Sequence, residues 1–161
     1  MTTNKKSTPN WKNIRRLRNR LAKLKETEHK QFFMSDYIRI LSGKKSGQLV
    51  SVAELRKNGP ACGSACCMAG ETVVSMGPPE LAFRIEEVDR FESYDGRISA
   101  KRVFQEAKKI LGLTKDEAEY MFHGDWICES LGNIITEDAV HYLDMVLESK
   151  DVMVHSRCDY E

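Results

Sequence analysis

Residues 62–70 constrain the fold of this chain more than any other stretch. The nine residues, CGSACCMAG, hold three cysteines and five small side chains. Such a segment is either a reactive or metal-binding site, or a buried helix start where only small side chains fit against closely packed neighbours. We favour packing, because free cysteine commonly behaves as a small buried hydrophobe. The segment therefore predicts a helix over 62–76, ended by Gly77-Pro78-Pro79.

Length and composition indicate one domain with its own core, since the chain has 161 residues, of which 41% are hydrophobic and 30% charged. No run approaches the roughly 18 apolar residues of a membrane span. The first residues, MTTNKK, have no apolar stretch behind them, so we expect no secretory signal there. We expect five reduced cysteines in a cytoplasmic protein. We also expect a disordered tail over 1–10, one domain over 11–150 and a flexible tail over 151–161.

Apolar periodicity predicts a mainly α fold of about five helices in one compact domain, to which a small β-hairpin near 81–98 could be added. The clearest helix covers 10–29, where Trp11, Ile14, Leu17, Leu21 and Leu24 recur at helical spacing. Three further helices follow a cap at Ser99, a capping box from Thr114 to Glu117, and a cap at Thr136. Segment 31–40 could start extended. The predicted core is Ile14, Leu17, Leu21, Leu24, Phe32, Met34, Cys62, Cys66, Ala69, Val73, Val103, Phe104, Ile110, Leu113, Met121, Phe122, Val140, Leu143 and Leu147.

The net charge of +1 hides a strong polarity along the chain. Residues 1–30 hold ten Lys and Arg against two Glu, whereas residues 116–161 hold twelve Asp and Glu against one Lys and one Arg. This asymmetry suggests either a charged partner or two ends that face each other. The first helix supplies the candidate binding surface for nucleic acid or an acidic protein, with an aromatic ring that could stack on bases. Its residues are Trp11, Lys12, Arg15, Arg16, Arg18, Arg20, Lys23 and Lys25. The alternative is that these long side chains only cover a solvated helix face.

Catalytic and metal-binding patterns are weak. Cys62 and Cys66 are four residues apart, but a zinc site needs paired cysteines with a return pair at ordinary spacing. Cys62 could gain thiolate character at a helix start, yet nothing in the sequence fixes a His base for it. The loop 42–47, SGKKSG, lacks the order of a phosphate-binding loop. We predict no catalytic residue, no metal ligand and no cofactor.

Several motifs together resemble a group of small uncharacterised phage and bacterial proteins. These are the basic amphipathic helix, Phe32-Phe33-Met34, the C-G-[ST]-x-x-C-x-x-G pattern at 62–70, the LGLT sequence at 111–114, the segment 118–122 and a Thr-capped last helix. The resemblance covers about residues 12–148, and Glu71 departs from it, because the family has an aromatic residue or His after the last glycine. The resemblance brings no assigned activity and implies a phage-encoded protein acting inside a bacterial cell.

We therefore predict a non-enzymatic interaction protein of phage type, which binds, and could also inhibit, a host or anti-phage defence macromolecule. The alternative is a nucleic-acid-binding accessory protein that uses the basic first helix. A third hypothesis is a thiol enzyme or zinc protein built on Cys62 and Cys66. A homodimer fits the charge asymmetry, and no membrane partner is expected.

Overall fold

The computed structural model describes residues 8–27, 38–40, 47–58, 64–86, 96–98, 100–128 and 134–155. The helices in these ranges are α1 (Trp11–Thr27), α2 (Val52–Asn58), α3 (Met68–Met76), α4 (Ala100–Leu111), α5 (Lys115–Phe122) and α6 (Thr136–Ser149). The strands are β1 (Ile38–Ile40), β2 (Leu49–Ser51), β3 (Ser64–Cys66), β4 (Ala82–Glu86) and β5 (Gly96–Ile98). The prediction of a mainly helical protein is confirmed.

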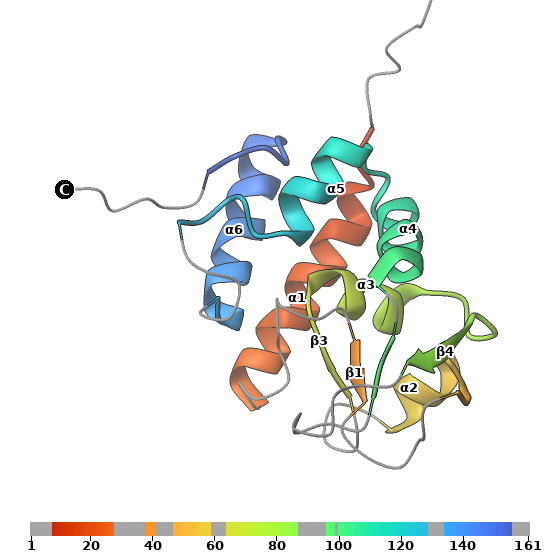
Figure 1. Ribbon diagram of the computed structural model, residues 1–161. Coiled ribbons are helices and arrows are strands. Elements are labelled where there is room, and N and C mark those ends of the chain that lie inside the picture. Colours follow the sequence, from red (N-terminus) through yellow and green to blue (C-terminus); the bar gives the residue numbers. More distant parts are fainter. Residues whose placement is uncertain are drawn as a thin grey trace, which may run out of the picture.

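The five short strands form one antiparallel sheet in the order β2-β4-β5-β1-β3. It lies at the lower end of the molecule in Figure 1, with most of the helices above it. The predicted hairpin near 81–98 is present, since β4 and β5 pair with Ile85 opposite Ile98. The sheet is wider than this hairpin because β1 and β3 pair beside β5 and β2 pairs beside β4.

Helix α1 forms where the apolar stripe predicts it, and that stripe is buried. Ile14, Leu17 and Leu21 are fully buried, and Leu24 is 2% exposed. The helix begins after Asn10, whose side-chain oxygen accepts a hydrogen bond from the amide of Asn13 at 3.0 Å, as an N-cap residue does. The Asn10 amide also donates to the Leu111 carbonyl at 2.8 Å. The expected disordered tail over 1–10 is therefore wrong for 8–10, and residues 1–7 lie outside the described residues.

The predicted helix over 62–76 is only half correct. Residues 64–66 form strand β3, in which Cys66 pairs with Ile38 of β1, and helix α3 begins at Met68. The sheet satisfies the backbone of residues 64–66, so long-range pairing overrides the local helical pattern there. The second half matches the prediction. Residues 68–74 are all buried, and the Gly77 amide closes the helix on the Val73 carbonyl at 2.8 Å.

The turn between α4 and α5 follows the local sequence signals. Gly112 has φ +66°, and a Cβ there would lie 3.0 Å from the Thr8 carbonyl oxygen, so both conformation and space favour glycine. The predicted capping box is confirmed. Thr114 Oγ1 accepts from the Glu117 amide at 3.2 Å, and the Glu117 carboxylate accepts from the Thr114 amide at 3.0 Å.

The predicted cap of the last helix is wrong. The N-cap residue of α6 is Ile135, not Thr136, and the Asp138 carboxylate accepts its amide hydrogen at 3.0 Å. Thr136 is instead the first helical residue, 1% exposed, and its hydroxyl has no hydrogen-bond partner among the described residues. The predicted cap at Ser99 lies outside the described residues.

The core contains most of the predicted residues and two aromatic side chains that the pattern missed. Phe104 and Ile110 are only partly buried. Phe32, Met34, Cys62 and the side chain of Cys66 lie outside the described residues. All other predicted members are buried. The rings of Trp126 and Tyr142 are fully buried and stack with centroids 4.5 Å apart.

The segment after α6 is held against the body of the protein. Val152 is 1% exposed, and its carbonyl accepts a hydrogen bond from the Tyr142 hydroxyl at 2.6 Å. The Val154 carbonyl accepts from the Tyr120 hydroxyl at 2.9 Å. The expected flexible tail over 151–161 is thus wrong for 151–155, and residues 156–161 lie outside the described residues.

Candidate binding surface on helix α1

Helix α1 is the element that carries the predicted binding residues, and its neighbours divide them into two groups. The helix packs along α6 on one side and along α3 on another. Arg18 contacts Asp144 of α6, and Arg20 contacts Glu71 of α3. At about 100° per residue, this arrangement leaves one arc of α1 facing solvent. The exposed cations on that arc, here called the basic face, are Lys12, Arg15, Arg16 and Lys23.

Arg18 belongs to the interface with α6. Its Nε lies 2.8 Å from Asp144 Oδ1, and its Nη2 lies 3.4 Å from Asp144 Oδ2. The hydrogen bond to Asp144 raises the pKa of Arg18, which is already charged at neutral pH. The pair joins the basic first helix to the acidic last helix. Among the described residues, the basic first helix and the acidic last helix therefore do face each other, one of the two explanations that the sequence left open.

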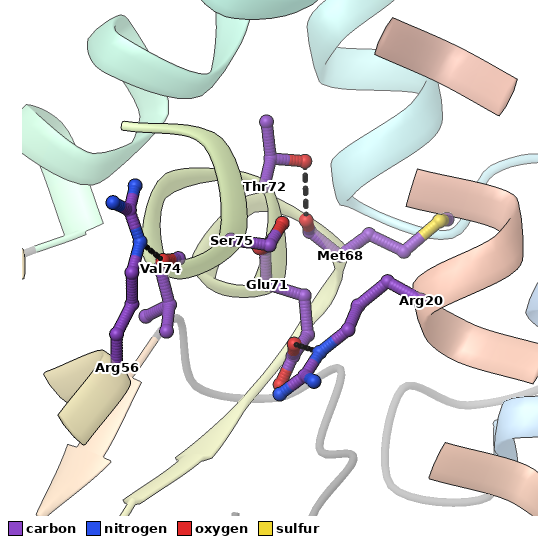
Figure 2. Close-up of polar contacts among 7 residues, drawn as sticks. All are labelled: Arg20, Arg56, Met68, Glu71, Thr72, Val74 and Ser75. Carbon is purple, nitrogen blue, oxygen red and sulfur yellow. Dashed lines mark hydrogen bonds and ion pairs between the residues drawn. The ribbon is translucent and has the colours of Figure 1, made fainter. Parts of the chain in front are cut away.

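Arg20 pairs with a buried carboxylate of the protein itself. Its Nε lies 3.2 Å from Glu71 Oε2, and the Glu71 side chain is only 5% exposed. Figure 2 shows Arg20 reaching from α1 to the Glu71 carboxylate on α3. A carboxylate buried to this extent is costly without a cationic partner. Arg20 thus has a structural reason to be basic, whatever else α1 does.

Trp11 is also engaged within the protein. Its side chain is partly buried against the core, and the Lys150 ammonium lies 5.0 Å from the ring centroid, within cation–π range. Base stacking by Trp11 would have to displace this contact. Lys25 falls at the end of α1, and its side chain lies outside the described residues.

A pocket of about 460 Å³ opens beside the basic face, where α1, α2 and the carboxyl end of α3 meet. It is lined by Asn13, Arg16, Arg56, Ser75, Met76 and Gly77. Arg56 donates from Nε to the Val74 carbonyl at 2.6 Å and from Nη2 to the Gly77 carbonyl, and Figure 2 shows the first of these bonds. Sequence reasoning missed Arg56, because nothing in the α2 sequence signals that α3 will end beside it.

The cysteines do not form a recognisable reactive site in the described part of the chain. Cys67 is a fully buried free thiol, and burial raises its pKa to about 12. Cys128 is disulfide-bonded, so the expectation of five reduced cysteines is wrong there. Cys62 lies outside the described residues, as does the side chain of Cys66. Among the residues that the structure describes, no three His, Cys, Asp or Glu side chains gather as a metal ion would need.

Comparisons with protein-family models, curated proteins and solved structures found no match to this chain. Within the described ranges, no helix is long and apolar enough to cross a membrane.

Proposed function

We propose that the protein is a non-enzymatic interaction protein that binds an acidic surface of another protein through the basic face of α1. The observation that carries the proposal is the exposure of Lys12, Arg15, Arg16 and Lys23 on one side of a helix whose residues 11–25 include no Asp or Glu. Lys12, Arg15 and Arg16 form no ion pair with any described residue. The family resemblance adds the expectation that the partner is a host or anti-phage defence protein in a bacterial cell.

The fixed position of α1 supports this proposal. Ion pairs on two sides, Arg18 with Asp144 and Arg20 with Glu71, tie the helix to α6 and α3. The buried stripe fixes its rotation about its own axis. A surface that is already ordered loses less conformational entropy when a partner binds. The four cations are therefore presented on a rigid ridge about 16 Å long from Lys12 to Lys23, at 1.5 Å per residue.

An acidic protein surface fits this ridge better than single-stranded nucleic acid does. Binding of single strands relies on aromatic platforms beside the basic groups, and the Trp11 ring is already engaged with Lys150. Two of the arginines counted in the sequence, Arg18 and Arg20, already pair with carboxylates of the protein itself. Nucleic-acid binding remains the alternative that the experiment must separate.

The decisive experiment compares two variants with the same loss of charge in a pulldown from bacterial lysate. The test variant replaces the basic face with glutamine, at Lys12, Arg15, Arg16 and Lys23. The control variant replaces four exposed lysines elsewhere, at Lys57, Lys101, Lys109 and Lys115. Glutamine keeps helix propensity close to that of Lys and Arg, so both variants should fold.

We expect the test variant to bind the identified partner at least tenfold more weakly, about 1.4 kcal/mol, with the control variant unchanged. Equal binding by the test variant and the parent would refute the proposal. Nuclease treatment separates the two partner classes. Loss of the partner after nuclease treatment would replace the proposed function with the nucleic-acid alternative.

A further inference from the structure

The pocket between α1, α2 and α3 has two guanidinium groups and no carboxylate among the residues that line it. Arg56 is held in place because its Nε and Nη2 bond to the carbonyls of Val74 and Gly77 at the carboxyl end of α3. Arg16 approaches from α1 and forms no ion pair with a described residue. One cation is thus fixed by the fold, and the second is exposed beside it.

The charge of this pocket matches a doubly charged anion. The two guanidinium groups carry two positive charges, and the carboxyl end of α3 offsets about half a charge. A phosphate monoester carries about −1.5 to −2 charges near pH 7, whereas a carboxylate carries one. Arginine also presents a planar set of N–H donors that suits phosphate oxygens.

Neutral groups complete the lining. Asn13 uses its Nδ2 to donate to the Ile110 carbonyl at 2.9 Å, and the same amide has a second N–H to offer. The Ser75 hydroxyl donates to the Glu71 carbonyl at 2.5 Å and can turn toward a ligand. The volume of about 460 Å³ exceeds what one phosphate group fills, so part of the attached organic group also fits.

We propose that this pocket binds the phosphate group of a phosphate monoester, with Arg16 and Arg56 as the charged ligands. The pocket shares Arg16 with the basic face, but phosphate binding here does not depend on the proposed protein partner. A small phosphorylated molecule and a phosphorylated side chain present the same group, and the experiment separates these two sources.

The test is an NMR titration of the amides of the full chain with inorganic phosphate, at ionic strength held constant with NaCl. We expect saturable shifts at residues 75–77. Arg16→Gln should weaken binding at least about fivefold, because it removes one of two charged ligands. Arg15→Gln is the matched control, since Arg15 is exposed on the same helix but does not line the pocket. It should change the affinity by less than about twofold.

Further measurements test whether the pocket prefers the doubly charged form of the phosphate group, and which kind of molecule carries that group. Binding of phosphoserine should strengthen from about pH 5.5 to 7.5, because the second pKa of a phosphate monoester is about 6. Acetate should bind more weakly than phosphate. Tighter binding of phosphoserine than of a nucleoside monophosphate assigns the group to a phosphorylated side chain, and the reverse order assigns it to a small molecule. The proposal would be overturned by any one of four results. These are an absence of saturable shifts, equal effects of the two arginine variants, acetate binding as tight as phosphate binding, or an affinity that does not change with pH.

A triple variant keeps this proposal separate from the proposed function. Glutamine at Lys12, Arg15 and Lys23 should weaken partner binding and leave phosphate binding intact. Arg56 is not substituted, because it also holds the carboxyl end of α3. Loss of phosphate binding in the triple variant would show that the anion binds the basic face and not the pocket.

Discussion

Replacing Arg20 with glutamine should destabilise the protein far more than the same replacement of Arg18, two residues away. Both arginines pair with a carboxylate on a neighbouring helix. The pairs differ in the burial of the acid, because the Glu71 side chain is 5% exposed and the Asp144 side chain is 50% exposed. Arg20→Gln therefore removes the Arg20 cation from a buried carboxylate, whereas Arg18→Gln leaves a carboxylate that water can solvate.

The magnitudes follow from these burials. Removing one partner of a fully buried ion pair costs about 3–5 kcal/mol. The Arg20 side chain is 30% exposed and Glu71 has another contact, so we expect a smaller loss, about 2–3 kcal/mol. An exposed pair such as Arg18 with Asp144 is worth less than about 1 kcal/mol. For a chain of this size, Arg20→Gln should lower the melting temperature by about 4–12 °C.

Urea unfolding followed by circular dichroism gives the free energy of unfolding of each variant by linear extrapolation. A second comparison isolates the buried charge. Arg20→Met combined with Glu71→Met should be more stable than Arg20→Met alone, because the double variant removes both charges of this ion pair. Equal losses for Arg20→Gln and Arg18→Gln, within about 0.5 kcal/mol, would refute the argument from burial.

Four further predictions concern the core. Tyr142→Phe removes the buried hydroxyl that donates to the Val152 carbonyl, and should lower the free energy of unfolding in urea by about 1–2 kcal/mol. Tyr120→Phe should cost less, because the Tyr120 hydroxyl is less buried. Equal losses for the two variants would contradict this. Cys67 should resist iodoacetamide at pH 8 until the protein unfolds, as mass spectrometry can show, because burial raises its pKa to about 12. Because the pKa of Cys67 is higher in the folded state, its protonated thiol favours folding fully below about pH 8.5. This contribution to the free energy of unfolding is lost as the pH rises toward 12. A free energy of unfolding that does not fall over this range would count against burial of Cys67. Ala69→Leu should lower stability by about 1–3 kcal/mol through overpacking of α3, and an unchanged melting temperature would exclude close packing there.

The sequence by itself determined the features that depend on residues a few positions apart. The spacing of Ile14, Leu17 and Leu21 fixed both the extent of α1 and its buried side, because the helix repeat places these side chains on one stripe. The Thr114 capping box was equally predictable, since its two hydrogen bonds join residues three apart. In such cases the interacting groups are brought together by the helix itself.

Only the tertiary structure decided which basic residues of α1 remain on its surface. Arg18 meets a partner 126 positions away and Arg20 one 51 positions away, so no local pattern could separate them from Arg15 and Arg16. The same reason explains the error at 64–66, where pairing with β1 replaces the predicted helix. It also explains why the sequence did not predict the pocket at Arg56. Helices α1, α2 and α3 must pack together before Arg16 and Arg56 line the same pocket.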